Sequence, residues 1–288
     1  LVLKTVTEVA EFWGTLLSGV EKAAEEYGVE LKVLTSPREI DIDKQIELIR
    51  QVTADKPDVM ILSAADYDRC AEATEEAIAA GIGVVAIDTD VNAAGRACFV
   101  GSNSYEIGLE MGRAMASYLP EGGKVAVIQH MLTTTTGIER TRGVLDALNE
   151  AGNIEILGSF CCDNSTEQAQ TITTELLSAD PEIRGFVCTN EVCNVGAANA
   201  LVELGMGGRV YVVGCDNSQR QIQFLEQNII QAIVTQRPFN MGYVAVQQAV
   251  RVANGEQTDD FVEVSCVLIT RENMYTQENQ KLLFPVLR

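Results

Sequence analysis

The segment VYVVGCDN at residues 210–217, followed by IIQAIVTQRP at residues 229–238, decides the fold. Val210 to Val213 is a short apolar run rich in β-branched residues, which is typical of a buried parallel strand. Asp216 comes just after it, and Gln236 comes just after the next apolar run at residues 230–235. Because ligands of open α/β sheets bind outside the carboxyl ends of the strands, we expect Asp216 and Gln236 to share one crevice.

The same alternation of short apolar runs and amphipathic segments extends over the chain on both sides. The predicted strands lie at residues 1–6, 29–34, 58–62, 83–87, 97–100, 124–128, 154–160, 186–188, 210–213, 230–235 and 261–269. The predicted helices lie at residues 12–27, 41–54, 69–80, 106–118, 139–149, 167–177, 192–204, 218–227 and 241–253.

Strands that alternate with helices predict an α/β fold with parallel sheets. About ten strands are many for one open sheet and fit two sheets of about five or six. The chain has 288 residues and no low-complexity linker, so we expect two lobes with short crossings between them.

Composition excludes several classes of protein. The formal charge of −20 disfavours binding to nucleic acid or to an anionic membrane. No apolar run approaches the ~20 residues that a membrane span needs. The chain begins at Leu1 rather than Met, so we expect it to be processed or truncated, with any secretion signal or lipid anchor removed.

The eight cysteines are scattered, mostly in apolar or strand contexts, and we interpret them as small buried hydrophobic residues. Adjacent Cys161 and Cys162 could instead form a redox pair. Cys188 and Cys193 lack zinc spacing, and the chain has a single histidine. We therefore expect no metal and no cofactor.

Polar side chains gather where the predicted strands end. Carboxylates and amides follow five strands, an arginine follows a threonine run at residues 133–136 that either caps the next helix or reaches a ligand, and two aromatic residues open the first helix. Carboxylates accept hydrogen bonds from sugar hydroxyls, arginine and amide groups donate to them, and aromatic rings cover the C–H surface. The set predicts a site for a neutral polyol: Phe12, Trp13, Asp66, Asp88, Arg140, Asn190, Asp216 and Gln236.

We expect Arg140 to pair with Asp88 or Asp216, because a buried charge without a partner is costly. The single histidine, His130, also follows a strand, and we interpret it as a bystander.

The order and spacing of these motifs resemble the type 1 periplasmic sugar-binding proteins, the ribose-binding-like group whose fold is shared by the effector domain of the lactose-repressor family. The resemblance runs from about Lys4 to Ile269. The residues that carry it are 11–13, 18–20, 58–66, 83–88, 101–103, 140–144, 189–191, 213–216 and 235–236.

The resemblance implies two Rossmann-like lobes joined by a three-crossing hinge. The N-terminal lobe would hold residues 1–102 and 237–265, and the C-terminal lobe residues 103–236 and 266–288. The crossings would fall near residues 102–104, 236–237 and 265–267. The ligand would bind in the cleft between the lobes and draw them together by hinge closure, contacting the eight residues above, with Asp66 at a position that some members use.

Departures from the ribose-binding pattern leave the ligand open. Thr89 stands where ribose binders have an arginine, and Ala10 stands where an asparagine is usual. Another pentose, a hexose, an inositol or a related polyol remains compatible with the site.

The function implied is that of an extracytoplasmic solute-binding protein of an ABC-type transporter, working as a monomer with a membrane permease. It would act in the periplasm or outside the cell, free or lipid-anchored. The alternative is the ligand-sensing domain of a transcription regulator or of a membrane sensor kinase system, which uses the same fold.

Enzymatic function is not expected. The glycine cluster at residues 205–208 follows a helix and precedes a strand, opposite to a dinucleotide-binding loop. The chain has no Walker loop and no Gly-x-Ser-x-Gly elbow. Two carboxylates could hydrolyse a glycoside only at a separation that the sequence does not give.

Overall fold

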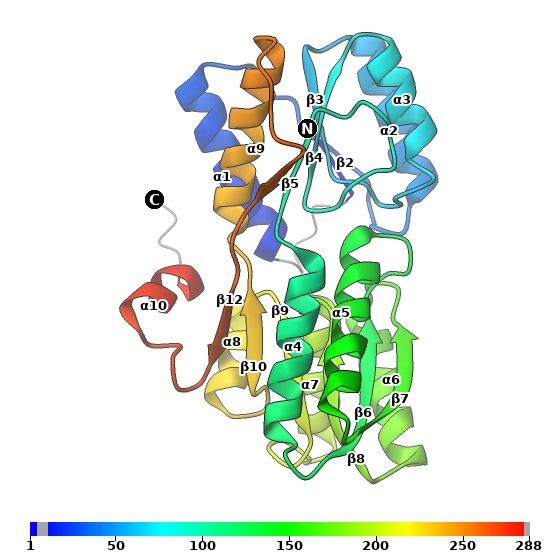
Figure 1. Ribbon diagram of the computed structural model, residues 1–288, viewed down its shortest axis with the longest axis vertical. Helices are drawn as coiled ribbons and strands as arrows, with labels where there is room; N and C mark the ends of the chain where they lie inside the picture. The colour runs from blue at the N-terminus through cyan, green and yellow to red at the C-terminus, as the bar shows by residue number, and fades with distance from the viewer. Residues whose placement is uncertain (5–10, 285–288) are drawn as a thin grey trace. The chain divides into compact units, whose positions relative to one another are not determined.

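A computed structural model describes residues 1–4 and 11–284 of the chain (Figure 1). Strands alternate with helices along these residues, so the predicted α/β class is confirmed. The strands are β1 (Val2–Leu3), β2 (Leu34–Thr35), β3 (Val59–Leu62), β4 (Gly83–Ile87), β5 (Cys98–Gly101), β6 (Gly123–Gln129), β7 (Ile154–Cys161), β8 (Ile183–Cys188), β9 (Tyr211–Cys215), β10 (Ala232–Thr235), β11 (Phe261–Glu263) and β12 (Val267–Thr270). The helices are α1 (Glu11–Tyr27), α2 (Ile42–Asp55), α3 (Ala71–Ala79), α4 (Ser104–Tyr118), α5 (Thr135–Ala151), α6 (Thr166–Ala179), α7 (Glu191–Glu203), α8 (Gln219–Glu226), α9 (Pro238–Ala253) and α10 (Gln277–Leu283).

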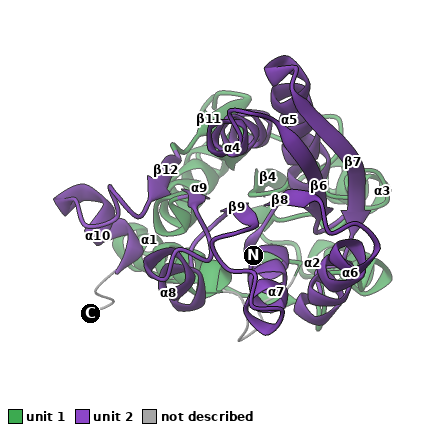
Figure 2. Cartoon of the chain, turned by 90° about the horizontal axis from the view of Figure 1, so that it is seen from below, with its two compact units in different colours: residues 1–103, 133–135, 237–265 green, residues 104–132, 136–236, 266–288 purple. Residues whose placement is uncertain are grey.

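The chain forms two compact units, coloured separately in Figure 2. Unit 1 holds residues 1–103, 133–135 and 237–265, and unit 2 holds residues 104–132, 136–236 and 266–288. The lobe boundaries expected from the sequence concern two bodies that move independently of each other, and they remain a prediction.

Unit 1 is built on a sheet with the strand order β11-β5-β4-β3-β1-β2, in which the paired strands are parallel. Helices α1 and α9 cover one face, where Leu16 and Met241 pack on Val85 and Ile87. Helices α2 and α3 cover the other face with a separate apolar cluster. Because both faces are buried, the strands are apolar throughout instead of alternating with polar residues.

Unit 2 repeats this plan with the strand order β12-β10-β9-β8-β6-β7. Val125 and Val127 of β6 pack with helices α4 and α5, whereas Ala126 and Ile128 pack with α6, α7 and α8. The β10–β12 pair is antiparallel, and the other pairs are parallel. Strand β9 of unit 2 therefore occupies the place that β4 occupies in unit 1.

Most predicted elements are present, but several bounds were wrong. Residues 261–269, predicted as one strand, are two: β11 pairs with β5 in unit 1, and β12 pairs with β10 in unit 2. The apolar pattern continues across Ser265 because both halves are strands, so periodicity could not show the change of sheet. Strand β1 ends at Leu3, and the predicted strand end at Val6, like Ala10, lies outside the described residues.

Helix α5 begins at Thr135, four residues before the predicted start at Glu139. Arg140 therefore lies in the second turn of this helix, whereas the predicted start would have placed it in the first turn. Threonine has a low intrinsic helix propensity, which made the run at residues 133–136 look like a loop. Helix α9 likewise begins at Pro238, a residue that is favourable in the first turn.

Six of the eight cysteines are buried and two, Cys161 and Cys266, are partly exposed; none of these eight described residues forms a disulfide. The interpretation of the cysteines as small buried hydrophobic residues therefore holds for the majority. Burial raises the pKa of the Cys70 and Cys98 thiols to about 11, so both stay neutral at physiological pH. Among the described helices, none has the length and apolar character to cross a membrane.

Candidate functional site

The carboxyl edge of the unit 2 sheet carries a set of polar side chains that are buried, except for the partly exposed Asn190. Asn190, Asp216 and Gln236 follow β8, β9 and β10, as the sequence predicted, and His130 follows β6. These four strands are parallel neighbours, so their ends meet at one edge.

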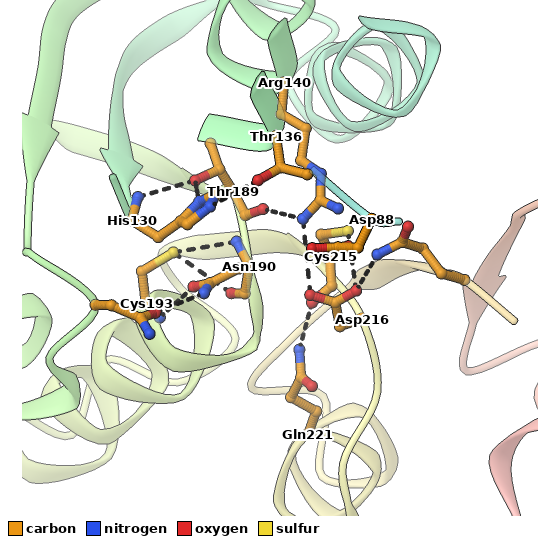
Figure 3. Close-up of polar contacts among 12 residues, drawn as sticks. Asp88, His130, Thr136, Arg140, Thr189, Asn190, Cys193, Cys215, Asp216 and Gln221 are labelled. Carbon is orange, nitrogen blue, oxygen red and sulfur yellow. Dashed lines mark hydrogen bonds and ion pairs between the residues drawn. The ribbon is translucent and has the colours of Figure 1, made fainter. Parts of the chain in front are cut away.

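Arg140 reaches this edge from helix α5 and is 2% exposed. Its Nη1 donates to the carbonyl oxygen of Thr189 at 2.8 Å and lies 3.7 Å from Oδ2 of Asp216 (Figure 3). Asp216 is one of the two aspartates that the sequence offered as a partner for Arg140, and this ion pair is present. The amide Nε2 of Gln236 donates to the other carboxylate oxygen of Asp216 at 2.7 Å.

The turn after β9 holds Asp216 in a left-handed backbone conformation, with φ of +69°. Aspartate tolerates this region better than most residues. The backbone N–H of Asp216 donates to the carbonyl of Val234 on β10, and Nε2 of Gln221 donates to the carbonyl of Cys215. Burial raises the pKa of the Cys215 thiol well above its usual value, so this neighbour of the carboxylate stays uncharged.

Asn190 has a structural task at the same edge. Its Oδ1 accepts from the backbone N–H of Cys193 at 3.1 Å and caps helix α7, and its Nδ2 donates to Oδ1 of Asn164. A second lone pair on Oδ1 and a second hydrogen on Nδ2 leave capacity for a further partner.

Unit 1 has a corresponding set at the edge of its own sheet. Asp88 follows β4, is 6% exposed, and has the same left-handed backbone, with φ of +63°. The ammonium group of Lys4 lies 3.6 Å from its carboxylate and 2.6 Å from that of Glu39. Lys4 and Glu39 are themselves buried, so the three charges form one ion-pair cluster.

Sequence reasoning missed Lys4 and Glu39. Lys4 directly follows β1, so the strand-end rule could have found it, but the predicted strand ran on to Val6 and placed Lys4 inside it. Glu39 lies in the connection after β2, and nothing in its sequence surroundings distinguishes it from a solvated loop residue.

The remaining predicted residues of unit 1 are placed as follows. Oδ1 of Asp66 accepts from the backbone N–H groups of Asp68 and Arg69, so this oxygen stabilises a turn before α3. The rings of Phe12 and Trp13 meet edge to face, with centroids 5.1 Å apart. Trp13 is 5% exposed and packs in the core of unit 1, with the Lys4 ammonium 5.6 Å from its ring centroid.

The threonines that the sequence singled out are engaged within the protein. Thr89 is buried and bonds to the carbonyl of Ala64 and to the hydroxyl of Ser63. Oγ1 of Thr133 donates to the carbonyl of Ala65, and Oγ1 of Thr135 accepts from the N–H of Asp90. These contacts shape the loops after β3 and β4.

The unit 2 edge combines a buried cation, a carboxylate and amides, and the unit 1 edge combines a buried cation with carboxylates. Both sets suit hydrogen bonding to a neutral, hydroxyl-rich molecule. Within the described residues, no group of three or more His, Cys, Asp or Glu side chains is placed to hold a metal ion.

A family model described as "Periplasmic binding protein domain" matches residues 2–257. The chain belongs to this family. The D-allose-binding periplasmic protein of Escherichia coli is 25% identical over 285 residues, which cover 94% of this chain and 91% of that protein.

Two solved structures resemble this chain over nearly all of its length. A carbohydrate transporter solute-binding protein from Agrobacterium radiobacter, in complex with D-arabinose, has a TM-score of 0.94 at 24% identity and covers 98% of this chain and 97% of its own. That likeness confirms the predicted fold. An ABC transporter periplasmic solute-binding protein from Actinobacillus succinogenes, with bound D-allose, has a TM-score of 0.87 at 26% identity and covers 94% of this chain and 96% of its own.

Proposed function

We propose that this chain is a receptor that binds a monosaccharide or related polyol and delivers it to the membrane permease of an ABC importer. The observation that carries the proposal is the buried contact of Asp216 with both Arg140 and Gln236 at the carboxyl edge of the unit 2 sheet. The family match and the names of the relatives support it, because the relatives described above are binding proteins and not enzymes.

The chemistry of these three groups fits a sugar hydroxyl array. A guanidinium donates to ring or hydroxyl oxygens, a carboxylate accepts from hydroxyls, and an amide can do either. Arg140 and Asp216 already neutralise each other, so a neutral ligand can add hydrogen bonds without leaving a buried charge unpaired. A charged ligand would instead leave a buried charge without a partner.

We propose that residues of unit 1 also contact the sugar. Asp88 would accept from sugar hydroxyls, with Lys4 added as a donor that the sequence reading missed. Phe12 and Trp13 would cover an apolar face of the ring. Asn190 and Asp66 would contribute their remaining hydrogen-bonding capacity. The binding cleft and hinge closure expected from the sequence stay part of this proposal.

We also propose that the protein acts as a monomer. It would act in the periplasm or outside the cell, either free or lipid-anchored. The alternative role in ligand sensing uses the same fold, but the relatives named above are described as binding proteins of transport systems.

A thermal-shift screen of the purified chain against pentoses, hexoses, inositols and nucleosides tests the proposal. A ligand that binds the native state at 1,000 times its Kd adds about 4 kcal/mol to the free energy of unfolding, which raises Tm clearly. We expect one sugar or a few related sugars to do so. An unchanged Tm with every sugar, in protein freed of ligand by unfolding and refolding, would contradict it.

Substitution of the unit 2 residues tests the assignment of the site. Asp216→Asn preserves the shape of the side chain and its tolerance of a left-handed backbone, but it removes the charge that faces Arg140. We expect this variant and Arg140→Met each to lose about 2–5 kcal/mol of binding free energy by calorimetry, since each leaves a buried charged partner unmet.

Asp163→Asn is the matched control. Asp163 is also an aspartate with a left-handed backbone in unit 2, but it is exposed. It should bind sugar like the wild type. Wild-type affinity in both Asp216→Asn and Arg140→Met would show that the sugar binds elsewhere.

A further inference from the structure

His130, the single histidine of the chain, joins three elements of unit 2 at the carboxyl edge of its sheet. It follows β6 and is 2% exposed. Its ring Nδ1 lies 2.7 Å from Oγ1 of Thr189, after β8, and its Nε2 lies 3.2 Å from Oγ1 of Thr136, on α5 (Figure 3).

The backbone of His130 also contacts Thr189. Oγ1 of Thr189 accepts from the backbone N–H of His130 at 3.0 Å, so its own hydroxyl hydrogen can donate to Nδ1 of the ring. The side chain of Thr189 is thus held from two directions by one residue.

Thr189 in turn sets the position of Arg140. Its carbonyl oxygen accepts from Nη1 of Arg140 at 2.8 Å, and its backbone N–H donates to the carbonyl of Ile128 on β6. A long arginine side chain loses about 2 kcal/mol of rotamer entropy when it is fixed. When the side chain is already fixed in the protein without ligand, this entropy loss does not weaken ligand binding.

We propose that His130 is a positioning residue for ligand binding, which fixes Thr189 so that the Thr189 carbonyl presets the Arg140 guanidinium. This inference rests on the proposed function. His130 does not contact the sugar in this scheme. It acts through a neighbour, and the bystander interpretation made from the sequence is the hypothesis that it replaces.

Three substitutions separate positioning from simple filling of space. His130→Phe keeps an aromatic ring but loses both hydrogen bonds. His130→Asn retains a polar atom near the place of Nδ1 and loses the contact with Thr136. Thr189→Val removes the hydroxyl and preserves the carbonyl that Arg140 uses. Thr173→Val is the control, because Thr173 is equally buried in unit 2 but bonds within helix α6.

Affinity for a sugar found in the screen is measured by calorimetry, and the free energy of unfolding without sugar is measured separately in urea. We expect His130→Phe and Thr189→Val to weaken binding about tenfold, which is 1.4 kcal/mol, and His130→Asn to recover part of that loss. The double variant should be no weaker than the worse single variant, because both remove the same link. Thr173→Val should lose stability and bind normally.

The wild-type protein provides an independent readout if a variant fails to fold. One histidine gives one pair of ring proton signals in an NMR spectrum, so no assignment is needed. Adding sugar should shift these signals with the Kd found by calorimetry, since Arg140, Thr189 and the ring are linked.

The outcomes distinguish the two hypotheses. Ring signals that do not move at saturating sugar, together with normal affinity in His130→Phe and Thr189→Val, would overturn the positioning role and leave the proposed function intact. A wild-type protein that binds no sugar would overturn both. If Thr173→Val weakened sugar binding as much as the His130 and Thr189 variants, the cause would be a general loss of rigidity, and the positioning role would be overturned.

Discussion

Asp88 and Asp216 occupy corresponding positions, one in each unit. Each follows the third strand of its sheet, counted from β11 in unit 1 and from β12 in unit 2, and each has a left-handed backbone. The N–H of Asp88 donates to Val100 of β5, as that of Asp216 donates to Val234 of β10. Each carboxylate lies near a buried cation, Lys4 in unit 1 and Arg140 in unit 2.

The two aspartates could be predicted from sequence because each directly follows a recognisable apolar strand. Their partners could not all be predicted. Lys4 and Arg140 come from different kinds of element, a strand end and the second turn of a helix, so no common spacing connects each cation to its aspartate.

The partly exposed Cys161 gives a prediction about thiol reactivity. Burial raises its pKa to about 11, although the side chain is only partly covered. Since the thiolate is the reactive form, about one molecule in a thousand is reactive at pH 8. We expect slow labelling of Cys161 by iodoacetamide at pH 8 and faster labelling as the pH rises toward 11.

Peptide mapping by mass spectrometry follows this reaction. Protein unfolded in urea is the control and should be labelled at Cys161 within minutes at pH 8, where the thiol has its ordinary pKa. Rapid labelling of Cys161 in the folded protein at pH 8 would show that the thiol is not shielded.

At the scale of elements, helices α1 and α9 illustrate what local sequence patterns miss. They pack side by side in Figure 1, although they are far apart in the sequence. A Cβ on Gly19 of α1 would lie 2.0 Å from the carbonyl oxygen of Phe239, so the two backbones approach closely at this glycine. The sequence predicted both helices, but only the packing explains why residue 19 is small.

Substitution of two glycines in the same helix tests this packing. Gly19→Ala should lower the free energy of unfolding by about 1–3 kcal/mol, because the added methyl group must displace backbone. Gly14→Ala is the matched change, with no atom within 4 Å of the added Cβ, and should raise it by about 0.5–1 kcal/mol through helix propensity.

Urea unfolding of the two variants beside the wild type measures both effects. A neutral Gly19→Ala would mean that α1 and α9 can move apart without loss. A destabilising Gly14→Ala would mean that the first turns of α1 have a constraint other than helix propensity.

At the scale of the whole molecule, the excess of acidic residues dominates. The formal charge of −20 was evident from composition, and it acts against the compact state through self-repulsion. Salt screens such repulsion, since the Debye length falls from about 30 Å at 0.01 M to about 8 Å at 0.15 M. We therefore expect Tm at pH 7 to rise when sodium chloride is increased over that range.

Scanning calorimetry at two pH values checks the cause. Near the isoelectric point of about 4.4 the net charge is close to zero, so the effect of salt on Tm should largely disappear. A Tm at pH 7 that falls with added salt would mean that surface ion pairs outweigh the repulsion.

The sequence by itself determined the α/β class, the two series of strands and helices, the acidic character, and the strand-end positions of Asp88, Asn190, Asp216 and Gln236. These depend on local patterns: burial of both sheet faces makes the strands apolar, and polar residues follow where each strand ends.

The tertiary structure alone decided which of these groups meet. It paired Arg140 with Asp216, brought Lys4 to both Asp88 and Glu39, connected His130 to Thr189, and divided residues 261–269 between two sheets. These contacts depend on which strands are neighbours in a sheet. Strand order is set by packing between segments that are far apart in the chain. The periodicity of any one segment carries no information about that packing.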